Sequence, residues 1–506
     1  MNKKRLLAGL TSLVMALTAL SGCGEPKQTN TGNEEIPTLT YYWPAGVSDT
    51  NIKGVQDELN EYLKEKLNCQ VELHALSQAE FKERSPLMLS TGEEVDLMFS
   101  ASWLNYLMLA GQNSFTELSD LLNKYGQGIK DCLQEDYLKA PLVNGKLYGI
   151  PSNKDIAQGY GLFMDKETLD AAGVKIEDIK TLEDIEPILK YLKENKPGVS
   201  PLPKTLESGN VWLSTKAALE EGYSDHSKLE TGFDGWGGLI AFDKAKDEFV
   251  LISPENSNVF VAAVELMHDW YKKGYFSEDI IADTTTDDAQ SLWKEGKSWY
   301  YVSSNTPGRL ESIEKRVEKE VVLATLRPEI ANTDSMIGSL TTIPRSSKNP
   351  ELAMQFLNLI YTDEKVSNLL AHGQEGVNYI KVDDDVIEAV KVGDFAWPHG
   401  NNWYLGDNFN QYIMNTQIPD YKQQLMAYNN AAPRSELVGF SFDSSNMKNE
   451  VAAINNVYSQ YKKIFFTGAG TPEKDIKDFF SKIEQAGINE VVKEYNKQYQ
   501  AWKANK

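Results

Sequence analysis

Histidines, cysteines and glycine-rich loops are the usual carriers of chemistry, and this chain has few of them. It holds five histidines and three cysteines in 506 residues, and no two histidines stand four apart as a zinc-binding helix requires. Residues 296–298 (GKS) resemble the end of a phosphate-binding loop, but the earlier glycine of that motif would fall at Ser291. Gly-x-Ser-x-Gly is absent, so a hydrolase nucleophile has no candidate. We therefore expect no metal, no cofactor and no catalytic activity.

Acidic residues dominate the charge of the chain. Seventy-three Asp and Glu face 51 Lys and Arg, for a formal net charge of -22. A surface of this sign repels a phosphate backbone, so nucleic acid is excluded as a partner. With so many carboxylates, the chain could also contain the pair of acidic residues that a glycoside hydrolase uses for catalysis, although nothing in their spacing selects one pair.

Aromatic residues are abundant, with 10 Trp, 24 Tyr and 18 Phe. A flat ring packs against the C–H face of a sugar while nearby Asn, Asp and Ser bond its hydroxyls. Rings inside strand patterns, such as Tyr41 and Phe99, are expected in the core. Six tryptophans stand instead at strand ends or in polar loops and are candidates for a ligand-binding surface: Trp43, Trp103, Trp212, Trp236, Trp397 and Trp403.

The N-terminus has the form of a secretory signal. A positively charged segment, residues 2–5 (NKKR), precedes an apolar run, residues 6–20, that is too short to span a bilayer as a stable helix. Residues 20–23 (LSGC) look like a bacterial lipobox, in which the cysteine is lipidated and becomes the new N-terminus. We expect a signal peptide over residues 1–22, lipid (palmitate among it) on Cys23, and a flexible tether over residues 23–37. This predicts a lipid anchor on the extracytoplasmic face of the bacterial cell membrane. Cys69 and Cys132 could pair there or remain free.

From residue 39 the pattern alternates between strands and helices. Strands at residues 39–43, 69–75 and 95–99, separated by amphipathic helices, predict a β-α-β-α-β start. Such strands pair in parallel, and their ligands bind beyond the carboxyl ends, here after Trp43 and around Trp103. Later patterns predict a second domain and a mostly helical C-terminus.

Short motifs spread along the chain then match one family. Residues 90–99 (STGEEVDLMF), 144–151 (NGKLYGIP), 164–166 (MDK), 270–275 (WYKKGY), 295–297 (EGK) and 343–350 (IPRSSKNP) occur in the order found in the family 1 extracellular solute-binding lipoproteins of bacterial ABC importers, which the chain resembles. Residues 439–443 (GFSFD) and 498–502 (QYQAW) resemble a C-terminal domain of unknown function in a long-chain subset usually associated with carbohydrate import.

The resemblance implies an α/β, two-lobed periplasmic-binding-protein-like fold with a hinge and an inter-lobe ligand cleft. By that likeness lobe one comprises residues 36–153 plus 304–348, and lobe two comprises 154–303 plus 349–506, including the extra C-terminal segment. Together, the resemblance and the loop aromatics give these candidate ligand-binding residues: Trp43, Ser100, Trp103, Asn153, Asp155, Trp212, Trp236, Ser303, Asn305, Trp403 and Phe442.

The function predicted is capture of an oligosaccharide and its delivery to the permease subunits of an ABC importer, by a monomer that closes on its ligand. Maltose-binding relatives have an aromatic directly after the third strand. That place is Ser100 here, so ligand identity does not carry over. One alternative is a binding protein for a peptide or another polar solute. Another is a surface-anchored glycoside hydrolase, with two cleft carboxylates about 5 to 9.5 Å apart.

Overall fold

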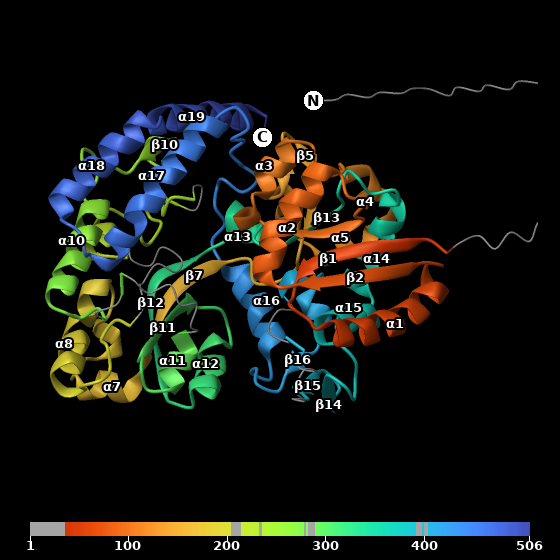
Figure 1. Ribbon diagram of the computed structural model, residues 1–506, viewed down its shortest axis with the longest axis horizontal. Helices are drawn as coiled ribbons and strands as arrows, with labels where there is room; N and C mark the ends of the chain where they lie inside the picture. The colour runs from red at the N-terminus through yellow and green to blue at the C-terminus, as the bar shows by residue number, and fades with distance from the viewer. Residues whose placement is uncertain are drawn as a thin grey trace, which may run out of the picture. The chain divides into compact units, whose positions relative to one another are not determined.

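The structure is a computed structural model that describes residues 36–203, 214–231, 235–277, 280–281, 289–390, 397–398 and 403–505. Residues Pro37–Lys506 form one structural unit, and Figure 1 shows its elements. The predicted signal peptide, Cys23 and Trp212 lie outside the described residues. Within the described part of the chain, no helix is both long and apolar enough to cross a membrane.

A five-stranded sheet organises the N-terminal part, in the order β2-β1-β3-β13-β6. The first three strands pair in parallel, as the alternating pattern predicted, and the other two join antiparallel. Helix α1 lies against this sheet because Val55, Leu59 and Leu63, spaced by four, are fully buried on one face. The bounds are β1 (Thr38–Pro44), α1 (Asp49–Lys66), β2 (Gln70–Leu76), α2 (Gln78–Thr91), β3 (Leu97–Ser100), β6 (Gly149–Pro151) and β13 (Leu340–Thr342).

A second, three-stranded sheet has the order β11-β7-β12 and is antiparallel throughout. Its central strand alternates between two cores: Leu162 and Met164 enter a large hydrophobic cluster, and Phe163 enters a smaller one with Trp293 and Ile313. Helices therefore cover both faces. The bounds are β7 (Gln158–Asp165), α10 (Val259–Lys272), α11 (Ala289–Lys294), β11 (Tyr300–Ser304), α12 (Arg309–Val317) and β12 (Val321–Ile330).

Three long helices end the chain and pack on the second cluster. Phe260 of α10 stacks on Phe479 and meets Phe465 edge-on, and Phe249 contacts Tyr495 of the last helix. Figure 1 shows these helices in blue above α10. The bounds are β9 (Ile240–Asp243), β10 (Glu248–Leu251), α17 (Lys448–Thr467), α18 (Pro472–Gln485) and α19 (Ile488–Ala504).

Three chain segments cross between the two large hydrophobic clusters, at residues 157–162, 326–331 and 432–437. The first two are the paired ends of β7 and β12. The third hydrogen-bonds to the second, since Ala331 N–H donates to Pro433 O at 2.9 Å and Ser435 N–H donates to Ala331 O at 2.9 Å. Two lobes joined by adjacent crossing segments form the predicted two-lobed α/β fold. We call the part built on the five-stranded sheet the first lobe and the other the second lobe.

The lobe boundaries differ from those predicted. Helices α14 (Pro350–Thr362) and α15 (Glu364–His372), assigned to lobe two, bury their apolar faces in the first cluster. Helix α12 and most of β12, assigned to lobe one, pack on the second sheet. An amphipathic pattern shows that a helix has a buried face, but the lobe that covers it depends on long-range packing.

The remaining elements are shorter and complete the two lobes. In the first lobe they are α3 (Tyr106–Gly111), α4 (Ser119–Tyr125), α5 (Gln127–Cys132), α6 (Glu135–Lys139), β4 (Leu142–Val143), β5 (Lys146–Leu147), α13 (Thr333–Met336), β14 (Tyr379–Asp383), β15 (Val386–Ala389), β16 (Ile413–Met414) and α16 (Tyr421–Ala431). In the second they are α7 (Lys166–Ala171), α8 (Glu186–Asn195), α9 (Lys216–Glu220) and β8 (Leu229–Glu230).

Candidate functional site

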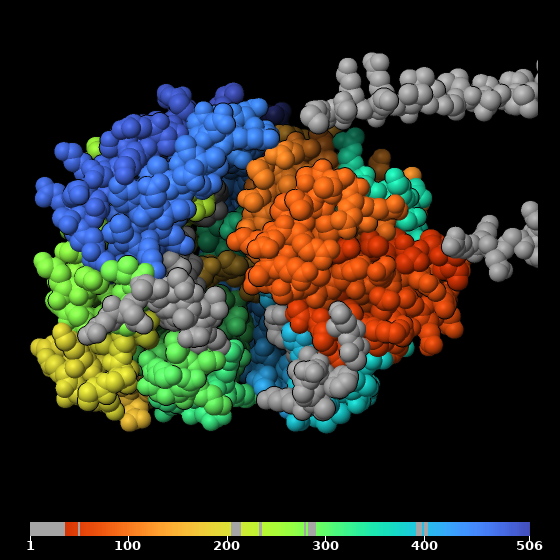
Figure 2. Space-filling model, in the orientation of Figure 1, coloured from red at the N-terminus to blue at the C-terminus, as the bar shows by residue number. Residues whose placement is uncertain are grey.

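A large cavity lies between the lobes. It measures about 1320 Å³ and takes wall residues from both hydrophobic clusters, among them Ile337 of the first and Tyr160 of the second. Figure 2 shows the surface hollowed between the N-terminal elements, in orange, and the C-terminal helices, in blue. Pockets for drug-sized ligands occupy about 300 to 1,000 Å³. The cavity therefore has room for a ligand of several sugar-sized units.

Two tryptophans of the first lobe line this cavity, both resting on one core ring. Trp103 lies in a short 3₁₀ turn just beyond β3 and is 40% exposed. Its indole N–H donates to Gly338 O at 2.9 Å, which holds the ring in place. Trp403 lies against Tyr404, with ring centroids 3.8 Å apart. Phe99 contacts both tryptophans, at 5.9 and 6.3 Å between centroids, so a core residue positions both rings.

Two aromatic residues of the C-terminal region, one in the loop before α17 and one on α19, form another part of the wall. Phe442 and Tyr495 both line the cavity, and their rings are stacked with centroids 3.7 Å apart and planes within 9°. Phe442 stays partly exposed, whereas Tyr495 is buried. The cavity is thus bordered by aromatic surfaces from both lobes.

Among the described residues, one side chain, that of Ser102, stabilises the charge of the wall carboxylate Asp334. Asp334 stands in the first turn of α13 and is open to the cavity. Although the residue is exposed to the cavity, the wall residues crowded around its carboxyl group remove part of its hydration and raise its pKa above the ordinary 3.8. A hydrogen bond with Ser102 partly offsets that rise. The carboxylate keeps free acceptor capacity, since two oxygens offer about four lone-pair sites. It can accept hydrogen bonds from ligand hydroxyls.

Opposite charges gather elsewhere on the wall. The ammonium of Lys154 pairs with Asp155 at 3.2 Å. The Nε of Arg309 is buried and has no hydrogen-bond partner among the described residues. Tyr421 stands near both Asp155 and Arg309. Burial, assisted by Asp155 and opposed by Arg309, raises the pKa of its phenol to about 12. The phenol therefore stays protonated at neutral pH and can donate a hydrogen bond.

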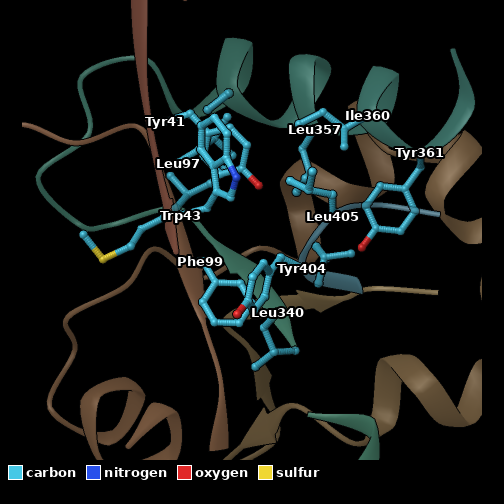
Figure 3. Packing of buried hydrophobic residues seen from close by; sticks show 14 of the residues in the cluster. Tyr41, Trp43, Leu97, Phe99, Leu340, Leu357, Ile360, Tyr361, Tyr404 and Leu405 are labelled. Carbon is cyan, nitrogen blue, oxygen red and sulfur yellow. The ribbon is translucent and has the colours of Figure 1, made fainter. Parts of the chain in front are cut away.

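The structure separates the predicted site residues into two groups. Trp103, Asp155, Trp403 and Phe442 line the cavity. Trp43 does not: it is 1% exposed and packs against Tyr41 at 4.9 Å in the first core, as Figure 3 shows. The interpretation of Trp43 as a cleft residue is therefore wrong, because its side chain points into the sheet's core.

Five further predicted residues also lie away from the cavity wall. Ser100 is buried in the strand ladder opposite Leu340. Asn153 is buried and its amide donates to Cys132 O at 3.2 Å. Ser303 pairs with Gly161 inside the second sheet.

Trp236 and Asn305 complete this group. Trp236 is 5% exposed and donates its indole N–H to Asn455 Oδ1. The amide of Asn305 donates to Thr325 Oγ1 at 3.3 Å. A neighbour in the fold thus takes the indole N–H of Trp236 and the amide N–H of Asn305, whereas the buried Oδ1 of Asn305 has no hydrogen-bond partner among the described residues. Trp397, a loop aromatic of the same kind, is buried and donates to Ala371 O.

Sequence reasoning missed Arg309 and Asp334. Neither residue belongs to a motif or a strand end, and no local signal distinguishes them from the other charged residues. They reach the cavity only because α12 and α13 begin beside it. Sequence reasoning also left the pairing of Cys69 and Cys132 open, and both thiols are free.

Two family models and two curated relatives match this chain. A family model described as bacterial extracellular solute-binding protein matches residues 59–391, and a domain of unknown function matches residues 436–504. A carbohydrate ABC transporter substrate-binding protein of Streptococcus pneumoniae is 26% identical over 524 residues, covering 100% of this chain and 99% of the relative. Lipoprotein LipO of Bacillus subtilis is 21% identical, covering 99% and 100% of the two chains.

Solved structures agree on the fold. The N-glycan transport solute-binding protein NgtS of Streptococcus pneumoniae has a TM-score of 0.75 at 23% identity, covering 92% of this chain and 98% of its own. The same protein has also been solved with Man1GlcNAc and with Man5GlcNAc. The two lobes, the inter-lobe cavity and a family match over most of the sequence lead to one conclusion: the chain belongs to the bacterial extracellular solute-binding protein family.

Proposed function

We propose that this protein is the substrate-binding component of a carbohydrate ABC importer, which captures an oligosaccharide between its lobes and delivers it to the permease subunits. The cavity carries this proposal, because its wall combines the rings of Trp103, Trp403 and Phe442 with polar side chains. Aromatic faces and hydrogen-bonding groups are what a sugar requires of its site. The names of the Streptococcus pneumoniae relatives, with a glycan bound to one of them, support the same ligand class.

Binding would use each lobe for part of the ligand. Trp103 and Asp334 come from the first lobe, whereas Arg309 and Phe442 come from the second. A ligand that contacts both sides stabilises the closed arrangement, since its contacts with both lobes exist only there. The three crossing segments are the structural hinge for this motion. A single copy of the chain supplies both sides, so the protein would act as a monomer.

Calorimetric titration with Man1GlcNAc and Man5GlcNAc tests the ligand class. We expect saturable binding of at least the longer glycan and none of a tripeptide of similar size. Binding of the peptide alone would contradict the proposal. Recovery of the glycan intact after long incubation separates a carrier from a glycoside hydrolase, whereas shortened products would identify an enzyme.

The membrane anchor is a separate part of the proposal. It rests on the lipobox at Cys23 and on the relative named as a lipoprotein. Acyl chains would hold the protein by about 0.8 kcal/mol per buried CH₂. Replacing Cys23 by Ala should release the protein from membranes. If the Cys23→Ala variant still sediments fully with membranes in high salt, the lipid anchor is contradicted.

A further inference from the structure

The C-terminal region, residues 436–504, matches a domain to which no function is assigned. We infer that this region is part of the ligand-binding site: its stacked Phe442 and Tyr495 form an aromatic platform for a sugar unit that a disaccharide does not reach. The region thereby favours long oligosaccharides over short ones. This inference rests on the proposed function and adds to it the size of the ligand.

Phe442 has the geometry of a binding platform. One face of its ring is covered by Tyr495, at 3.7 Å between centroids and with planes within 9°. Tyr495 is 3% exposed and is backed in turn by Phe249, at 5.1 Å. Phe442 remains partly exposed on the cavity wall. The supporting rings therefore leave the outer face of Phe442 to meet a ligand.

The platform is held rigidly by the last helix. Asp443 N–H donates to Gln498 Oε1 at 2.8 Å, and Gln498 Nε2 donates back to Asp443 O at 2.9 Å. Gln498 lies on α19, the helix that also carries Tyr495. Because the residue after Phe442 and the ring beneath it are fixed by one helix, little freedom is lost when a ligand binds.

The segment that carries the platform is attached to the first lobe as well. The hydroxyl of Ser441 donates to Leu142 O at 3.2 Å, and Gly439 N–H donates to Thr333 Oγ1 at 3.0 Å. Thr333 directly precedes the cavity residue Asp334. The C-terminal region thus reaches across to the first lobe where the ligand would lie, and does more than cover the back of the second lobe.

The platform and the two tryptophans come from different lobes. Trp103 and Trp403 share the support of Phe99 in the first lobe, whereas Phe442 belongs to the other side. The cavity wall includes residues of β15 and β16 as well as Tyr495 of α19. The cavity of about 1320 Å³ is larger than drug-sized ligands need. We therefore expect a disaccharide to bind at the two tryptophans alone and a longer glycan to reach the platform too.

Calorimetric titration of the purified protein with Man1GlcNAc and Man5GlcNAc tests this inference. Phe442→Ala should weaken Man5GlcNAc binding about five- to 150-fold, the loss expected for removing a buried apolar side chain. Man1GlcNAc binding should change less than twofold. Phe442→Tyr keeps a ring of the same shape and should retain the preference for the longer glycan.

Trp502→Ala is the matched control, because Trp502 lies in the same region and contacts Phe440 but is not among the described cavity residues. It should leave both affinities unchanged. If the wild-type protein binds both glycans and Phe442→Ala does not alter the ratio of their affinities, the platform is refuted while the proposed function stands. If the wild-type protein binds neither glycan, both are contradicted.

Discussion

The two lobes contribute to the cavity in different ways. In the first lobe, parallel β3 ends and the chain turns directly into the cavity at Ser102 and Trp103, as expected for the carboxyl end of a parallel strand. The second sheet is antiparallel, so its strands run in both directions and no edge collects their carboxyl ends. Its lobe reaches the ligand through a helix start, at Arg309, and a loop before the terminal helices, at Phe442. A rule derived from parallel sheets therefore locates only one side of this site.

A sharper contrast lies within the first sheet. Trp43 and Trp103 stand at the ends of adjacent parallel strands, yet one is in the core and the other lines the cavity. Both strands lie between two neighbours, but the residues after β1 bond back to β2, with Gly46 N–H donating to Leu76 O at 2.7 Å. The chain after β3 turns away instead through the 3₁₀ turn. A residue's position at a strand end therefore does not predict whether it lines the cavity, because the path of the following loop also decides this.

The largest expected effect is on folding and concerns Trp43. Trp43→Ala should lower the free energy of unfolding by about 3 to 5 kcal/mol, because it empties a fully packed site in the first core. Denaturant unfolding followed by fluorescence measures the loss. Trp43→Phe fills most of the space and should cost less, so it provides folded protein for titration. A glycan affinity reduced tenfold in folded Trp43→Phe would place Trp43 in the site after all.

Trp103 should show the opposite behaviour. Trp103→Ala should weaken glycan binding by about 1 to 3 kcal/mol, or roughly five- to 150-fold, since the ring offers apolar surface to the ligand. Unfolding should change little because the side chain is already 40% exposed. Calorimetry and denaturant unfolding on the same preparation separate the two effects. Unchanged affinity with reduced stability would break the distinction between the two tryptophans.

A smaller effect is expected at Asp334. Its pKa lies above the ordinary 3.8 because of burial, so the ionised form costs more in the folded protein than in the unfolded chain. This carboxyl therefore favours folding below its unfolded pKa, and that contribution is lost as the pH rises through the folded value. Ligand binding has the opposite dependence: if sugar hydroxyls donate to the carboxylate, affinity is full above the raised pKa and falls as the pH drops through it.

Asp334→Asn tests this directly, because Asn retains one acceptor oxygen and removes the charge. We expect a loss of about 1 kcal/mol, roughly fivefold in affinity at neutral pH. In the variant, the part of the decrease in glycan affinity at low pH that Asp334 causes should also be absent. Titrating both proteins at each pH cancels contributions from other groups, such as buried Glu230, whose pKa is also raised by burial. Parallel pH profiles for the two proteins would remove Asp334 from the site.

Much of the fold follows from local pattern. The β-α-β-α-β start is predictable because each helix and strand there carries its own periodic buried face, as Val55, Leu59 and Leu63 illustrate. The lobe boundaries were not predictable, since α14 would be equally amphipathic in either lobe. The sequence also could not show which loop tryptophans line the cavity, because Trp236 and Trp403 both stand among polar residues. Trp236 lies in the core, where its indole N–H donates to Asn455, more than 200 residues away in the chain.

The sequence by itself determined the class of protein and the character of its site. The sequence alone shows the strand and helix periods and the net charge of -22. It also shows the scarcity of metal-binding and nucleophilic residues and the family motifs in their order, and none of these features depends on how the chain folds. The tertiary structure alone decided which aromatic and charged side chains face the cavity. Phe442 is a platform only because Tyr495 stacks beneath it, and Arg309 and Asp334 meet one cavity only because two lobes place α12 and α13 around it. Ring stacking and shared burial depend on contacts between residues far apart in the chain, and local pattern carries no record of such contacts.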